Sequence, residues 1–168
     1  MNIIKSFLLA FVLTVAAAFS ASAQTPLAKL DGGTIDVRAQ NGKVVVLAVG
    51  ASWLPLSAKQ AEYVNALAKR YAGKNVVFYY VVTDSTNAKS KNFASDEAVK
   101  KFIAANKIGM SVLRDPDGAT VLKTFRIDQV PSFVIIDKSG AQAGEAFGGI
   151  DPKFDITVPI SKKIDSIL

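Results

Sequence analysis

Three continuous apolar runs constrain the fold of this chain more than any other feature. They are KVVVLAVG at 43–50, NVVFYYVV at 75–82 and PSFVIID at 131–137. Each run is short and rich in β-branched residues, and none alternates with polar residues, which is typical of strands buried on both faces. Segments with helical spacing separate the runs, and strands that alternate with helices indicate a parallel core with right-handed crossovers. The sequence therefore predicts an α/β fold.

The remaining patterns fill in the order of elements. Apolar residues recur at helical spacing in 55–73, and Ser95 can cap a second helix that has acidic residues in its first turn. A short helix is expected at 119–127, and a last one in the tail at 158–168.

Glycine and turn signals place the outer strands. A short hairpin is expected around 31–33, a short strand at 111–115, and an outer strand broken by glycines at 141–149. Together these elements predict one domain, in which helices flank a central mixed β-sheet that an N-terminal β-hairpin extends.

The first 23 residues have the composition of an export signal. Lys5 precedes an apolar run of 13 residues from Phe7 to Phe19, and small residues follow at 21–23. A membrane anchor is the alternative, but the run is shorter than the roughly 20 residues that cross a bilayer. We predict a signal peptide at 1–23, cleaved to leave a mature domain at 24–168 that is periplasmic or secreted.

The absence of two residue types excludes much chemistry. The chain has no cysteine and no histidine, so it has no thiol nucleophile, no thiolate or imidazole metal ligand and no Ser-His-Asp triad. The acidic turn at 115–117 offers too few oxygen ligands for calcium. We expect no metal and no cofactor.

The charge of the chain indicates an ordinary solvated surface. The net charge is +6, and losing Lys5 with the leader would leave +5. Lysines are scattered among carboxylates and form no basic stripe with exposed aromatics, so we expect no nucleic-acid partner. We also expect the mature protein to be a monomer without a membrane span.

Two segments resemble the thioredoxin-like superfamily, most closely its exported TlpA/ResA-type thiol-disulfide oxidoreductases. GKVVVLAVGASWLPLSAKQAE at 42–62 is similar to the strand, loop and helix in which that family carries a Trp followed by its cysteine pair. RDPDGATVLKTFRIDQVPSFVIIDKSGA at 114–141 is similar to the family's second half, where a Val-Pro pair precedes an apolar strand. The resemblance implies a thioredoxin-like fold over about residues 30–168.

This sequence departs from the family at the reactive positions. Leu54 and Ser57 stand where the family has cysteine. Leu54 cannot ionise, and Ser57 has no histidine to activate it, so we expect Ser57 to be a helix N-cap or a first-turn residue. The resemblance also implies a cis peptide bond before Pro131, with the backbone of Val130 free to pair with an extended peptide.

These observations predict a redox-inactive family member that binds an unidentified protein or an extended peptide. Trp53 could line a groove or cap the core, and the flanking leucines could form an apolar contact patch or pack inward. The expected site consists of Trp53, Leu54, Pro55, Leu56, Ser57, Val130 and Pro131.

Two alternatives stay open. The same loop could support an enzyme with non-thiol chemistry, for which Ser57, Asp84, Tyr79 and Tyr80 are the available polar groups. Asp84 could equally be a carboxylate that caps a turn or a helix. In the second alternative, the chain is a cysteine-substituted form of an active thiol-disulfide oxidoreductase.

Overall fold

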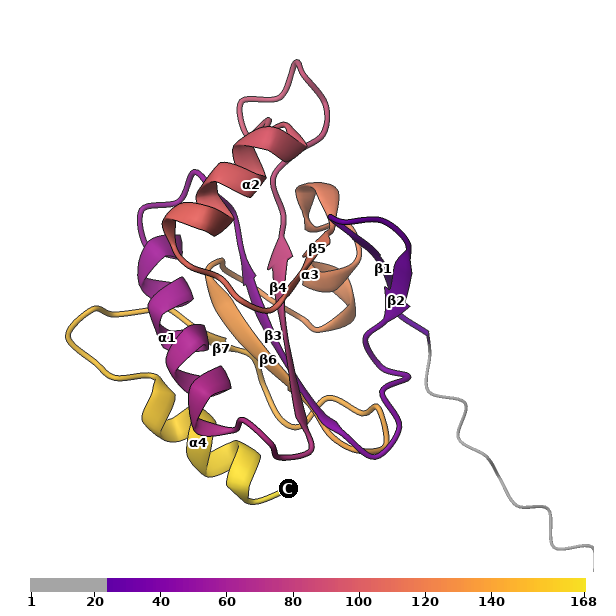
Figure 1. The fold of residues 1–168 in the computed structure, drawn as a ribbon, viewed down its shortest axis with the longest axis vertical. Helices are drawn as coiled ribbons and strands as arrows, with labels where there is room; N and C mark the ends of the chain where they lie inside the picture. The colour runs from indigo at the N-terminus through magenta and orange to yellow at the C-terminus, as the bar shows by residue number, and fades with distance from the viewer. Residues whose placement is uncertain (1–23) are drawn as a thin grey trace, which may run out of the picture.

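The three apolar runs form neighbouring strands of one seven-stranded sheet (Figure 1). The computed structural model describes residues 24–168. Its strands are β1 (Pro26–Lys29), β2 (Thr34–Asp36), β3 (Val44–Gly50), β4 (Val76–Val82), β5 (Ser111–Arg114), β6 (Ser132–Ile136) and β7 (Phe147–Gly148). Its helices are α1 (Ser57–Arg70), α2 (Asp96–Ala105), the 3-10 turn η1 (Pro116–Gly118), α3 (Val121–Thr124) and α4 (Thr157–Asp165).

The strand order is β2-β1-β5-β4-β3-β6-β7. Strands β3, β4 and β5 run parallel, as the α/β pattern predicts; β6 pairs antiparallel with β3, and β7 pairs antiparallel with β6. The β1–β2 hairpin extends the other side by pairing antiparallel with β5. The predicted mixed sheet with an N-terminal hairpin is therefore confirmed.

The strand register brings the two family-like segments to the same end of the sheet. Val49, near the end of β3, pairs with Ser132 at the start of β6. Gly50 pairs with Val82, the last residue of β4. The loop after β3 and the Val130–Pro131 segment before β6 therefore emerge side by side.

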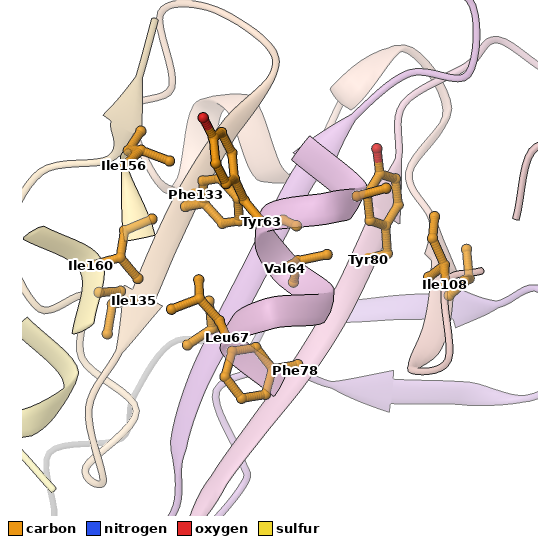
Figure 2. Close-up of a cluster of buried hydrophobic side chains, with 14 of the residues drawn as sticks. Tyr63, Val64, Leu67, Phe78, Tyr80, Ile108, Phe133, Ile135, Ile156 and Ile160 are labelled. Atoms are coloured by element: carbon orange, nitrogen blue, oxygen red, sulfur yellow. The ribbon is translucent and has the colours of Figure 1, made fainter. Parts of the chain in front are cut away.

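The core lies on both faces of the sheet, because every residue of β3 is buried. Val44, Val46 and Ala48 belong to the cluster on the face covered by α1, α2 and α4, and Figure 2 shows side chains of α1 packed against the sheet there. The alternate residues of β3 face α3. Since a fully buried Val or Leu contributes roughly 1.5–3 kcal/mol, this two-sided core can stabilise a domain that has no disulfides.

Helix ends agree with the sequence pattern, with one difference. The side chain of Ser95 accepts a hydrogen bond from the amide of Ala98 at 3.2 Å, as expected for the cap of α2. The first helix begins at Ser57, not at Pro55, because the residues before it form two hydrogen-bonded turns. Within residues 24–168, no helix is both long and apolar enough to span a bilayer.

Candidate functional site

The loop after β3 has a fixed backbone made of two consecutive turns. The amide of Leu54 donates to the carbonyl of Ala51 at 3.1 Å, and the amide of Ser57 donates to the carbonyl of Leu54 at 3.0 Å. Ser57 is the first residue of α1. It is thus a first-turn residue, one of the two roles that the sequence predicts for it.

The buried carboxylate of Asp84 holds the start of this loop. Asp84 follows β4 and is fully buried. It accepts one hydrogen bond from the amide of Ser52 at 2.8 Å and another from the hydroxyl of Ser52 at 2.5 Å. Asp84 therefore acts as a turn-capping carboxylate at the end of the sheet where the loop lies.

Replacing Asp84 with Ala is expected to lower the free energy of unfolding by about 2–3 kcal/mol, because the half-buried amide and hydroxyl of Ser52 lose their carboxylate acceptor. For a domain of this size that corresponds to a fall in melting temperature of roughly 4–12 °C. Thermal unfolding followed by circular dichroism measures this fall in melting temperature. Asp128→Ala, at an exposed residue without a hydrogen-bond partner in residues 24–168, is the control, and equal shifts for both variants would contradict the role of Asp84.

The outer side of the loop is apolar and separate from the core. Trp53 is 53% exposed. Pro55 is exposed, and Leu54 and Leu56 are half-buried. None of the four belongs to either core cluster of the described chain. Trp53 therefore presents much of its surface to solvent, and contact of this loop with a partner stays a prediction.

Ser57 lies beneath the loop with no group to activate it. Its side chain is fully buried, and its hydroxyl has no hydrogen-bond partner among residues 24–168. Burial raises the pKa of the neighbouring Tyr80 hydroxyl above its usual value, so this phenol stays protonated at neutral pH. Tyr79 faces the opposite side of the sheet. Of the polar groups considered for non-thiol chemistry, Tyr80 lies beside Ser57, but its hydroxyl donates to the side-chain oxygen of Gln60 and to the backbone carbonyl of Ser57. Asp84 bonds to Ser52 instead.

Gln60 is the residue that sequence reasoning missed. Its side-chain amide donates to the carbonyl of Val49 at 3.1 Å and to that of Ser132 at 2.7 Å. Its side-chain oxygen accepts from the hydroxyl of Tyr80 at 3.0 Å. A signal was present, because Gln60 lies one turn before Val64 on the apolar stripe of α1, where a polar residue needs buried partners.

Gly50 shows how closely these groups pack. A Cβ atom at Gly50 would lie 2.4 Å from the side-chain oxygen of Gln60 and 3.1 Å from the hydroxyl of Ser57. No side chain fits there without displacing the network. The glycine at the end of β3 therefore lets α1 approach the sheet directly below the loop.

The peptide bond between Val130 and Pro131 is cis, as the family resemblance implies. Pro131 is buried and Val130 is half-buried. Neither the amide nor the carbonyl of Val130 bonds to another residue in 24–168. Its backbone groups therefore remain available beside the loop.

Within residues 24–168, no group of three or more acidic side chains is placed to hold a metal ion.

The strand-loop-helix segment and the adjacent cis-proline lie on a sheet with the thioredoxin-like fold, in a chain without cysteines. The chain belongs to the AhpC/TSA family, whose model matches residues 13–141.

Relatives agree with this assignment. The chain is 28% identical to the thiol-disulfide oxidoreductase ResA of Bacillus thuringiensis subsp. konkukian over 119 residues, which are 71% of this chain and 63% of that protein. Among solved structures, a protein of Chlorobium tepidum described as the thiol:disulfide interchange protein DsbE superposes with a TM-score of 0.71 at 20% identity, covering 87% of this chain and 94% of that one. The exposed lipoprotein thioredoxin of Streptococcus pneumoniae superposes with a TM-score of 0.66 at 26% identity, over 86% of this chain and 99% of that one.

Proposed function

We propose that this protein is a redox-inactive, exported member of its family that binds an extended peptide or a segment of a partner protein. One observation carries the proposal: Leu54 and Ser57 occupy the two cysteine positions of an otherwise complete thioredoxin-like domain. Thiol-disulfide exchange requires a thiolate. The sequence supplies no cysteine elsewhere that could replace the pair.

Two features beside those positions support a role in binding. The free backbone amide and carbonyl of Val130 can pair with an extended chain by strand addition, which requires no reactive side chain. Trp53 exposes half of its surface beside them, and exposed aromatic residues are frequent anchors in protein interfaces. A partner would therefore receive main-chain hydrogen bonds and an apolar contact at one end of the sheet.

Export is part of the proposal. Residues 1–23 lie outside the described residues, so the predicted signal peptide rests on Lys5, the 13-residue apolar run from Phe7 to Phe19 and the small residues that follow. We propose cleavage after Ala23 and a monomeric mature protein in the periplasm or medium. Mass spectrometry of the protein recovered from a periplasmic fraction would identify the mature N-terminus.

The binding site is tested by affinity capture from periplasmic extract. We expect the native protein to retain a partner that the variant Val130→Asp/Leu56→Glu loses, because the two carboxylates would be desolvated in an apolar contact. Ala66→Glu/Ala72→Asp adds the same charge at exposed positions of α1 and the turn after it, and should retain the partner. Equal retention by both variants would place binding elsewhere, and insulin reduction by the native protein would contradict redox inactivity.

A further inference from the structure

A cavity of about 830 Å³ has Gln129 and Ser132, on either side of Val130 and Pro131, among its lining residues. Its walls come from four parts of the chain: Arg38 after β2, residues 124–129 at the end of α3 and beyond it, Ser132 of β6, and residues between 142 and 148. No residue of 53–57 lines it. Its volume is within the range of pockets that hold small molecules, roughly 300–1,000 Å³.

Arg38 is the distinctive residue of this cavity. Its guanidinium carbon lies 5.0 Å from the centroid of the Phe125 ring. The Nε atom is buried without an acceptor, and the guanidinium makes no ion pair or hydrogen bond with residues 24–168. A guanidinium fork held on an aromatic ring is preorganised for a planar oxyanion, which would satisfy two of its donors at once.

Ser132 provides a second, independent indication of a ligand. It is fully buried at the start of β6 and lines the same cavity. Its hydroxyl has no hydrogen-bond partner in the described residues. Buried hydroxyls are nearly always paired, so the Ser132 hydroxyl is a donor that a bound acceptor could satisfy.

The other charges at the cavity restrict what that acceptor can be. Arg126, Asp128 and Glu145 line it, all exposed, and none forms an ion pair with another or with Arg38. The two carboxylates at the rim repel negatively charged ligands. They therefore disfavour a ligand with several negative charges, such as a phosphate dianion, more strongly than a ligand with a single negative charge. We propose that this cavity binds a small organic molecule through one carboxylate group, which pairs with the guanidinium of Arg38.

The probe is N-benzoylglycine, and its amide N-benzoylglycinamide is a matched control of nearly the same shape without the charge. We expect titration calorimetry to show saturable binding of the acid to the full chain, and at least tenfold weaker binding of the amide. Arg38→Gln should weaken binding of the acid at least tenfold. Lys101→Gln removes the same charge from an exposed site on α2 and should leave the affinity unchanged.

Several results would overturn the proposal. These are equal affinity for acid and amide, no binding of the acid at millimolar concentration, or tighter binding of phenyl phosphate than of the acid. Because the acid and amide are compared on the native chain, that comparison does not depend on whether Arg38→Gln folds. Amide resonances in a proton–nitrogen correlation spectrum should move at Phe125 and Ser132, and shifts confined to 53–57 would place the ligand at the other site.

Discussion

The double variant Leu54→Cys/Ser57→Cys is expected to reduce insulin, whereas the native chain is expected to give only the uncatalysed background. Position 54 precedes the N-terminus of α1, where a cysteine pKa falls to about 7, so about half is thiolate at neutral pH. An unperturbed cysteine is only about 3% thiolate there. Because a thiolate of lower pKa is also a weaker nucleophile, the first cysteine should react roughly threefold faster than an equal concentration of ordinary thiol.

The turn between these positions allows the two sulfurs to bond. The amide of Ser57 donates to the carbonyl of Leu54 at 3.0 Å. Such a turn keeps its first and fourth Cα atoms within about 7 Å of each other, and disulfides span roughly 4.4–6.8 Å between Cα atoms. Loss of two thiols, measured by thiol titration after oxidation, would report the bond directly.

Single variants provide the controls for this experiment. Leu54→Cys alone should form a mixed disulfide with substrate and stop, because no second thiol resolves it. Ser57→Cys alone should be nearly inert, because its side chain is buried at the start of α1. A double variant that forms its disulfide but does not exchange with insulin would contradict the prediction, and with it the proposal that this loop still receives peptide chains.

The second large effect is expected for Gln60→Glu. The side-chain amide of Gln60 donates to two backbone carbonyls, and the carboxylate that replaces it has no donor to offer them. An unpaired charge would be buried against two oxygen atoms. We expect a loss of roughly 3–5 kcal/mol in the free energy of unfolding at pH 7, measured by urea denaturation.

The loss should depend on pH in a defined direction. Burial and the facing carbonyls raise the pKa of the introduced carboxyl in the folded state above its unfolded value of about 4.3. Between the two pKa values the folded protein binds more protons than the unfolded chain, so stability falls as pH rises through that window. Relative to the native protein, the variant should recover stability on acidification from pH 7 towards pH 4.5.

Gln129→Glu is the matched control, because it makes the same chemical change at an exposed side chain beside Val130. It should change the free energy of unfolding by less than about 0.5 kcal/mol, with little dependence on pH. Equal effects of the two variants would show that Gln60 is not the link between α1 and the sheet.

Local patterns predicted the helices and strands, because each element depends on short-range signals. The runs that became β3, β4 and β6 are short, largely apolar and rich in β-branched or aromatic residues, a pattern typical of central strands. The resemblance of the Val130–Pro131 pair to a family motif predicted a cis peptide bond before Pro131, and this bond is cis in the structure.

The polar contacts could not be predicted from the sequence, because they join residues that are far apart in the chain. The bond between Gln60 and Ser132 connects positions 72 residues apart, and the bonds from Ser52 to Asp84 span 32. Neither pairing has a local pattern, since strand register and helix packing together determine which groups meet. The stacking of Arg38 on Phe125 likewise depends on how α3 covers the far face of the sheet.

The two outer strands of the sheet have a consequence for how this protein meets other chains. β2 has three residues and β7 has two, so the sheet ends in very short borders with few unpaired amides and carbonyls. Such borders do not template the growth of a sheet from one copy to the next. Main-chain recognition at Val130 would then involve only a few backbone groups. We therefore expect a partner to be recognised over a short segment and not along a full strand.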